Sequence, residues 1–371
     1  MESVTSSASQ LFFQNSLAEV IRKLRSSNGK ENEMIDQFIA DTKREISSSV
    51  QSVKVTAIQK AAYFHMLGYP SAYANFNTIE VMADSYFGNK RTAYMAACTT
   101  FDENTDVIPL MTALLKRDLT SSNQYECGLA LYCIASICTT DLARDLVGDV
   151  VNLLSHPRAY VRKKAVLALY KIFLQYPESL RPVYPKLKQK LEDSSEHSDG
   201  DASVRGAVVS VLCELARRNP SNFLGLAVPF YSLLSNVHSN WTLIKVVKVF
   251  GYFAPFEPRL GKKLVEPLTN LIETTGAKSV QYECLLAVAN GLYKVPSLTK
   301  LVAQKLKIFI EDSDQNLKYL GLHALALMST HSAKLIADQR ESVMRCLDDA
   351  DITVRCKALE ILMNLVTEKN I

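Results

Sequence analysis

A short turn-and-helix pattern that recurs about every 37 residues constrains this chain of 371 residues more than any other feature. In each copy a polar turn precedes an apolar or β-branched residue, then a polar or charged residue, then small or apolar residues. The polar position falls at Lys54, Arg91, Glu126, Arg162, Arg205, Lys245, Gln281, Lys318 and Arg355. Such a period with two apolar runs is typical of stacked helical hairpins. The sequence therefore predicts an all-α, HEAT/armadillo-like right-handed α-solenoid of helix pairs.

Within each period the second apolar run is the stronger, and its spacing is helical. The predicted second helices span residues 161–174, 204–216, 243–253, 280–292, 317–328 and 354–366. We expect them to line the inner seam, each covered by the next repeat. Asp141 is predicted to cap the first helix that follows it. With only 13 Gly and 12 Pro, the chain has too few turn residues for a sandwich or barrel.

The domain organisation predicted from this pattern is simple. Residues 1–9 are polar and are expected to form a disordered lead, and residues 10–371 are expected to form the solenoid. The longest gap between copies contains the acidic, Ser-rich stretch 192–201, which we interpret as an exposed loop. A solvated linker and a phosphorylation site both stay open for this loop.

Charge and cysteine content bound the class of protein. A net charge of +4 is mild for this length and argues against a dedicated nucleic-acid-binding protein. The eight cysteines form no Cys-x-x-Cys pair and sit mostly in apolar runs, as reduced intracellular thiols do. The N-terminus lacks the basic and apolar regions of a signal peptide, and no apolar stretch approaches the roughly 20 residues that span a bilayer. We expect a soluble, cytoplasmic protein.

No pattern in the sequence indicates catalysis. The six histidines form no His-Glu-x-x-His or other pair at metal-ligand spacing. Phosphate-binding loops, dinucleotide fingerprints and nucleophile elbows are also missing. The sequence predicts a protein that is not an enzyme and that binds no metal or cofactor.

Basic clusters at predicted helix starts and turns are the candidate binding residues. Turns of successive repeats stack along one edge of a solenoid, so distant clusters can join. The candidates for contact with anionic lipid head groups are Arg162, Lys163, Lys164, Lys262 and Lys263. RNA phosphates would also suit such clusters, but interleaved aromatic residues for base stacking are not evident. Ordinary solvated turns stay open as the alternative.

Several longer blocks, above all residues 240–245 (Asn-Trp-Thr-Leu-Ile-Lys) and 314–321 (Asp-Gln-Asn-Leu-Lys-Tyr-Leu-Gly), are specific enough to indicate a family. Further blocks span 21–25, 66–69, 141–146, 161–165, 176–181, 213–220, 257–263 and 311–313. From about residue 10 to the end, the sequence resembles the N-terminal trunk of the large adaptins, most closely the delta branch of the third heterotetrameric adaptor complex.

This resemblance implies a subunit of a vesicle coat. In this family the trunk cradles a small sigma subunit, pairs with a beta-type large subunit and a medium mu subunit, and docks on membranes through an Arf-type GTPase. The complex sorts transmembrane cargo from endosomal or trans-Golgi membranes to lysosomes or vacuoles. The resemblance thus implies a cytoplasmic protein, peripheral on Golgi and endosomal membranes, without a nucleic-acid partner.

One residue role can be carried over, and two departures stand out. In related subunits an arginine at the end of the first helix helps to hold the acidic position of dileucine cargo signals, and here Arg25 matches that position. A solvated helix-end arginine is the alternative. The chain stops at Ile371, whereas family members continue, so we expect a trunk truncated at its C-terminus. The acidic loop also looks longer than the family's turn.

Two other functions compete with the adaptor reading. A general HEAT-repeat scaffold, of the nuclear transport receptor or phosphatase type, would bind partners without a membrane role. An RNA-binding helical repeat would need base-reading side chains at fixed positions. The recurring polar residues look like turn chemistry instead.

Overall fold

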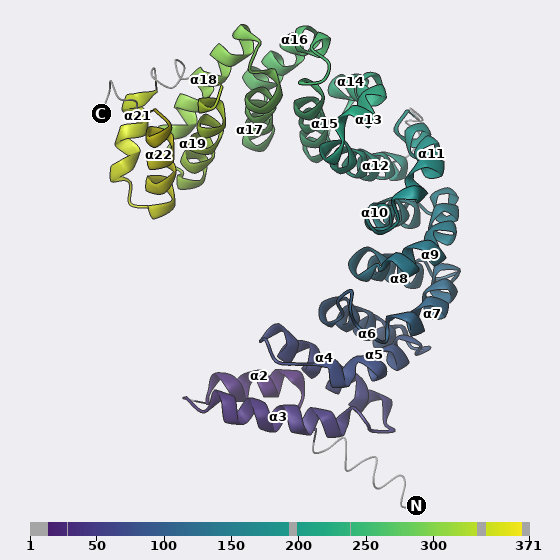
Figure 1. Ribbon diagram of the computed structural model, residues 1–371. Coiled ribbons are helices and arrows are strands. Elements are labelled where there is room, and N and C mark those ends of the chain that lie inside the picture. The colour runs from purple at the N-terminus through teal and green to yellow at the C-terminus, as the bar shows by residue number, and fades with distance from the viewer. Residues whose placement is uncertain (1–13, 28, 193–198, 238, 332–338, 366–371) are drawn as a thin grey trace, which may run out of the picture. The chain divides into compact units, whose positions relative to one another are not determined.

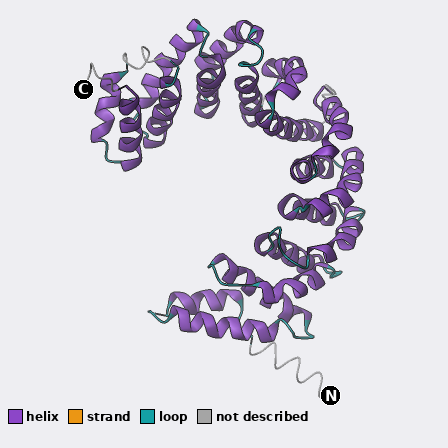
Figure 2. Ribbon diagram, in the orientation of Figure 1, coloured by secondary structure: helices purple, strands orange, loops and turns teal. Residues whose placement is uncertain are grey.

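The computed structural model describes residues 14–27, 29–192, 199–237, 239–331 and 339–365. Within these ranges every regular element is helical, and Figure 2 shows helices joined by loops without a strand. The predicted all-α, HEAT/armadillo-like solenoid of helix pairs is therefore confirmed. Residues 1–9, predicted as a disordered lead, lie outside the described residues, as do residues 193–198 of the acidic loop.

The chain divides into two compact units, Met1–Leu187 with Ser195–Ala207, and Lys188–Ser194 with Val208–Ile371. In the first unit α2 (Leu17–Arg25) precedes a series of helix pairs. The pairs are α3 (Glu31–Glu45) with α4 (Gln51–Met66), α5 (Asn75–Met82) with α6 (Phe87–Thr100), α7 (Met111–Leu119) with α8 (Gln124–Ile137), and α9 (Thr140–Asn152) with α10 (Ala159–Gln175). Successive second helices, α4, α6, α8 and α10, pack side by side (Figure 1).

Short 3-10 turns lead into or out of several first helices of this unit. They lie at Ala72–Ala74, Ile108–Leu110, Leu153–Ser155 and Pro177–Ser179. Helices α11 (Leu180–Glu192) and α12 (Asp199–Arg218) follow, and the boundary between the two units falls within them.

The second unit repeats the same arrangement. Its helices are α13 (Pro220–Phe223) and α14 (Ala227–Asn236) with α15 (Asn240–Phe253), α16 (Arg259–Thr274) with α17 (Lys278–Ala287), α18 (Pro296–Ile310) with α19 (Gln315–Ser329), and α21 (Arg340–Arg345) with α22 (Ile352–Leu365). Turns of 3-10 type lie at Leu224–Leu226 and Cys346–Asp348, and a π-helical turn at Val288–Leu292 continues α17. None of the described helices is long and apolar enough to cross a bilayer.

The core lies along the second helices because each is covered on more than one side. In α10 the residues Val161, Ala165, Ala168, Leu169 and Ile172 are all fully buried. Ala165 and Ala168 are small, so the neighbouring helices can approach closely, while the branched residues fill the remaining space. Burial of one β-branched or leucine side chain contributes on the order of 1.5–3 kcal/mol. This pattern matches the strongly apolar second runs of the sequence.

The backbones of α15 and of the turn after α17 meet at two glycines. A Cβ on Gly291 would lie 2.3 Å from the carbonyl oxygen of Gly251, and a Cβ on Gly251 would lie 3.1 Å from Cα of Ala287. Only glycine at position 291 permits this contact. Near the other end of α15 lies Trp241, the single tryptophan of the chain, which is 84% exposed.

The recurring polar position is the fourth residue of the second helix at Lys54, Arg162, Gln281, Lys318 and Arg355. In three other repeats it falls elsewhere in the helix, at the third residue (Glu126), the sixth (Lys245) or the seventh (Arg205). Lys54 Nζ bonds to Glu80 at 2.7 Å, and Lys318 Nζ bonds to Asp349 at 2.6 Å. In both cases the carboxylate belongs to the following helix pair. These lysines therefore connect one repeat to the next.

Arginine at the same position binds its own turn. Arg162 Nη1 donates to the carbonyl oxygens of His156 and Pro157 at 2.8 and 2.7 Å. Arg355 Nη1 donates to the carbonyl oxygens of Asp349 and Ala350 at 2.7 and 3.1 Å. The predicted turn chemistry is confirmed at these positions, because carbonyls left free at a helix end need donors.

In α6 the recurring position is Lys90, so the assignment of Arg91 was wrong by one residue. Lys90 is buried, and its Nζ lies 3.2 Å from Asp118 and 3.5 Å from Glu126. Tyr94 donates its hydroxyl to the same Asp118 at 2.8 Å. Burial, together with the Asp118 charge, raises the pKa of Tyr94 well above its usual range. Arg91 is exposed.

The cap of α9 also differs from the prediction. The side chain of Thr139 accepts a hydrogen bond from the backbone N–H of Leu142 at 3.3 Å and so caps the helix. Asp141, predicted as the cap, lies in the first turn. Its negative charge there favours the helix N-terminus.

Candidate functional site

The N-terminal helix α2 carries Arg25, the residue predicted to contact a cargo signal. Ser16 caps this helix: its hydroxyl accepts from the N–H of Glu19 at 3.3 Å, and its own N–H donates to the Glu19 carboxylate at 2.7 Å. This reciprocal pair is a capping box. The backbone hydrogen bond from Ser16, with the one from its hydroxyl, lowers the pKa of Glu19.

One face of α2 is buried and the other is basic. Val20 and Leu24 are buried in a cluster with Ile35 and Phe38 of α3 and Phe64 of α4. The basic residues of the last turn, Arg22, Lys23 and Arg25, are exposed. The apolar spacing of the helix thus determines which side of α2 presents its positive charge.

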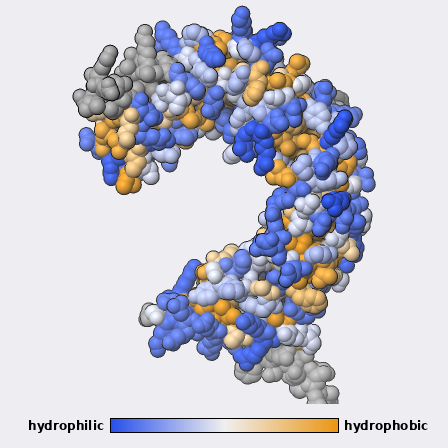
Figure 3. Space-filling model, in the orientation of Figure 1, coloured by the Kyte–Doolittle hydropathy of each residue, from blue (hydrophilic) through white to orange (hydrophobic). Residues whose placement is uncertain are grey.

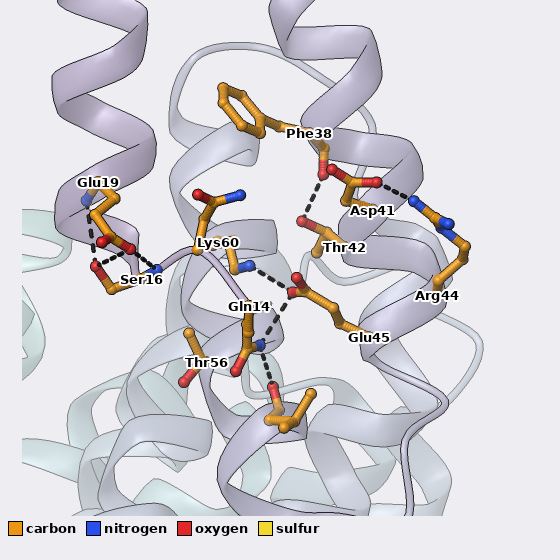
Figure 4. A network of polar contacts seen from close by, with 12 residues as sticks. Gln14, Ser16, Glu19, Phe38, Asp41, Thr42, Arg44, Glu45, Thr56 and Lys60 are labelled. Atoms are coloured by element: carbon orange, nitrogen blue, oxygen red, sulfur yellow. Dashed lines mark hydrogen bonds and ion pairs between the residues drawn. The ribbon is translucent and has the colours of Figure 1, made fainter. Parts of the chain in front are cut away.

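A partly buried carboxylate, that of Glu45, holds the start of α2 against α3 and α4 (Figure 4). Glu45 accepts a hydrogen bond from Gln14 Nε2 at 3.1 Å and also binds Lys60, whose side chain is only 2% exposed. Gln14 Nε2 bonds to the carbonyl oxygen of Val53 at 2.9 Å as well. Because a buried charge without a partner is costly, this arrangement fixes the segment that leads into α2.

Arg25 itself is exposed, and its side chain has no hydrogen bond or ion pair to any described residue. Its guanidinium is therefore available to a ligand. A guanidinium presents parallel N–H donors that match the two oxygens of a carboxylate. The geometry permits recognition of an acidic group.

The basic residues of α10 lie in three different environments. Arg162 uses its guanidinium on its own turn, as described above. Lys163 is exposed. Lys164 lies over two aromatic rings, with Nζ 5.6 Å from the ring centre of Tyr132 and 6.0 Å from that of Tyr160. Of the three, Lys163 presents the least constrained charge.

Lys262 and Lys263 belong to the other unit and to a different position of the repeat. They are exposed near the start of α16, a first helix, whereas the α10 residues lie on a second helix. The carbonyl oxygen of Lys263 accepts a hydrogen bond from the Tyr231 hydroxyl at 3.4 Å. The two sets do not occupy equivalent positions of the repeat, so stacking of equivalent turns does not by itself join them.

Sequence reasoning missed two groups of residues. One is the buried network of Lys90, Tyr94 and Asp118, to which Arg117 Nε also donates at 3.0 Å. The other is a set of exposed aromatic residues on α8 and α10, treated below. Among the described residues no three His, Cys, Asp or Glu side chains converge as metal ligands.

Comparison with known proteins identifies what this arrangement is similar to. The sequence pattern of the adaptin N terminal region matches residues 31–371. The chain is 46% identical to the AP-3 complex subunit delta-1 of Bos taurus over 366 residues and 45% identical to the AP-3 complex subunit delta of Dictyostelium discoideum over 360 residues. Each alignment covers 97% of this chain but only 30% and 31% of the relative. The chain therefore spans about a third of these proteins.

The fold is also similar to that of one chain of an adaptor assembly. A chain of a homology model of the full-length AP-3 complex, in an intermediate open conformation, superposes with a TM-score of 0.65 at 34% sequence identity. The match covers 86% of this chain and 55% of that chain.

Proposed function

The chain belongs to the adaptin family through its N-terminal region, and from this membership we propose that it is a non-enzymatic subunit of a vesicle-coat adaptor complex. It would act as a helical scaffold in intracellular protein transport. The observation that carries the proposal is the similarity to AP-3 delta subunits along nearly the whole chain. A repeat fold that offers long exposed helix faces is consistent with a scaffold.

The proposed partners follow from the family. They are a small sigma subunit, a beta-type large subunit and a medium mu subunit, together with an Arf-type GTPase at the membrane. The destination we propose is sorting from the endosome or trans-Golgi to the lysosome or vacuole, with the protein cytoplasmic and peripheral on Golgi and endosomal membranes. We propose no nucleic-acid partner.

Two surfaces are assigned within this proposal. Arg25 would bind the acidic residue of a dileucine signal, which the exposure and free guanidinium of Arg25 support. Basic residues of each unit would face anionic lipid. In the first unit these are the exposed Lys163 with its neighbours Arg162 and Lys164, and in the second unit they are the exposed Lys262 and Lys263. Each charge near the membrane surface contributes about 1 kcal/mol.

Co-purification tests the proposed assembly. The tagged chain is expressed in cells and recovered under mild salt, and its partners are identified by mass spectrometry. Recovery of beta, mu and sigma adaptins in comparable amounts is the expected result. Recovery of nuclear transport cargo or phosphatase subunits instead, without adaptins, would establish a general HEAT-repeat scaffold and refute the proposal.

A further inference from the structure

The exposed sides of α8 and α10 carry large apolar residues where a solvent-facing helix side is normally polar. On α8, Tyr125 and Tyr132 are 55% and 40% exposed, and on α10, Tyr160 and Leu167 are 40% and 39% exposed. Both pairs are separated by seven residues, which is about two helical turns, so each pair lies on one side of its helix. We call these four residues the tyrosine face. Figure 3 shows hydrophobic and hydrophilic residues interspersed over the visible surface of the first unit.

The rings of the tyrosine face are held in place before any partner binds. Tyr125 and Tyr160 contact each other with ring centres 5.9 Å apart, and Phe87 of α6 lies 6.4 Å from Tyr125. Tyr160 lies across Gly128, where a Cβ would come within 2.6 Å of its hydroxyl oxygen. Lys164 covers Tyr132 and Tyr160. Rings ordered in this way lose little conformational entropy on binding.

A hollow adjoins the face at Phe87. Its volume is about 470 Å³, and it lies between α4 and α6 with Leu17 of α2 at its edge. Phe87, Met95 and Ala96 give it apolar lining, and Arg91 also lines it. The hollow is large enough for one bulky aliphatic or aromatic side chain of a ligand whose neighbouring residues lie on the tyrosine face.

Most of the charge without an ion pair around this surface is positive. Arg91, Arg158 and Lys163 are exposed, and none has an ion pair within the described residues. The nearby acidic groups are engaged: Asp84, which precedes α6, has no ion pair among the described residues but accepts hydrogen bonds from Gln51, Asn89 and the N–H of Tyr86. Glu126 bonds to Ser121 at 2.7 Å and lies 3.5 Å from Lys90, and Glu103 pairs with Lys171 at 3.2 Å.

We propose that the tyrosine face and the adjoining hollow bind a peptide segment that carries acidic residues and at least two large apolar side chains. The apolar side chains would contact Tyr125, Tyr160 and the hollow, and the acidic ones would pair with Arg91, Arg158 and Lys163. This site is separate from Arg25 and goes beyond the adaptor function proposed above, on which it does not depend.

The geometry favours a peptide over single-stranded nucleic acid. The rings contact one another at 57° and 58°, so they do not present parallel, separate faces between which bases could stack. Three free cations are also few for a phosphate backbone, whose binding relies on many such contacts. A peptide with acidic and large apolar side chains matches both the positive charges and the aromatic rings of this surface.

The test is selection of peptides on the whole purified chain. A random dodecapeptide phage library is selected on the wild-type chain, and enriched peptides are synthesised with a fluorescent label for anisotropy titration. The test variant is Tyr125→Ser/Lys163→Glu. The control is Phe76→Ser/Lys116→Glu, which changes an exposed aromatic residue of α5 and an exposed lysine of α7. Thermal unfolding verifies that both variants fold.

The expected result is enrichment of acidic peptides with two or more large apolar residues. We expect the test variant to bind them at least tenfold more weakly and the control to bind them within twofold of wild type. Selected peptides without net negative charge, or unchanged binding by the folded test variant, would overturn the proposal. Tight binding of labelled oligouridylate that the test variant loses would overturn it in favour of nucleic acid.

Discussion

Replacement of Asp118 provides a severe test of the packing between repeats. Its side chain is 2% exposed and accepts hydrogen bonds from Lys90, Tyr94 and Arg117. Asp118→Asn removes the charge and leaves the Lys90 ammonium, itself 5% exposed, with only the more distant Glu126. Breaking a buried ion pair on one side typically costs about 3–5 kcal/mol. We expect the free energy of unfolding to fall by an amount near the lower end of this range, because Glu126 remains close to Lys90.

The assay is native-state hydrogen exchange, because a repeat protein need not unfold in one step. A loss of about 3 kcal/mol corresponds to exchange roughly 10² times faster for the amides of α6 to α8 that exchange through local opening. Amides of α16 to α22 serve as the internal control and should keep their rates.

A second variant separates the charge from the space it fills. Lys90→Met/Asp118→Leu removes both charges. Because replacing both partners of a buried ion pair by apolar residues is often neutral, we expect the double variant to lose less stability than Asp118→Asn alone. The reasoning is refuted if Asp118→Asn changes the α6–α8 rates by less than about fivefold, or if the double variant exchanges faster than the single one.

Three further predictions use other parts of the chain. Arg25→Glu should abolish binding of an acidic dileucine peptide by the assembled complex, since a charge-assisted hydrogen bond contributes roughly 1.5–3 kcal/mol. An affinity within twofold of wild type in a peptide titration would contradict the assigned role of Arg25. Gly291→Ala should lower the melting temperature, because the new Cβ would lie 2.3 Å from the Gly251 carbonyl oxygen. The control Gly148→Ala, in α9 with open space around it, should raise the melting temperature slightly. Equal effects of the two changes in thermal scans would argue against the close contact. Burial raises the pKa of Glu283 above its ordinary 4.5, against the opposing effect of Lys248, so the folded state holds the proton more tightly and this group's contribution to stability declines as pH rises through the raised pKa. Wild type should therefore gain stability relative to Glu283→Gln as pH falls from 7 toward 4.5, and a difference in melting temperature that stays flat would be inconsistent with this shift.

The helix pairs could be predicted from the sequence because their signal is local and repeated. The predicted polar position coincides with the fourth residue of the second helix at Lys54, Arg162, Gln281, Lys318 and Arg355. In α6 two adjacent basic residues fit the pattern equally well. Which of them is buried depends on Asp118, 28 residues further along the chain, and only the packing of α6 against α7 and α8 decides it.

The binding surfaces could be predicted less well. Arg25 and Lys163 were identified as exposed charges, and the structure agrees on their exposure. The tyrosine face was missed because its residues come from two repeats: Tyr125 and Tyr132 lie on α8, whereas Tyr160 and Leu167 lie on α10. No short sequence window contains both pairs. Their proximity arises when α8 and α10 pack side by side.

The single tryptophan gives this protein a built-in optical probe. Trp241 lies near the start of α15 and is largely exposed, so its emission should be that of hydrated indole and should be quenched readily by acrylamide. No other indole in the chain contributes to that signal. A shift of the emission to shorter wavelength on adding a tryptophan-free partner or lipid would therefore report that α15 has been covered, without any label.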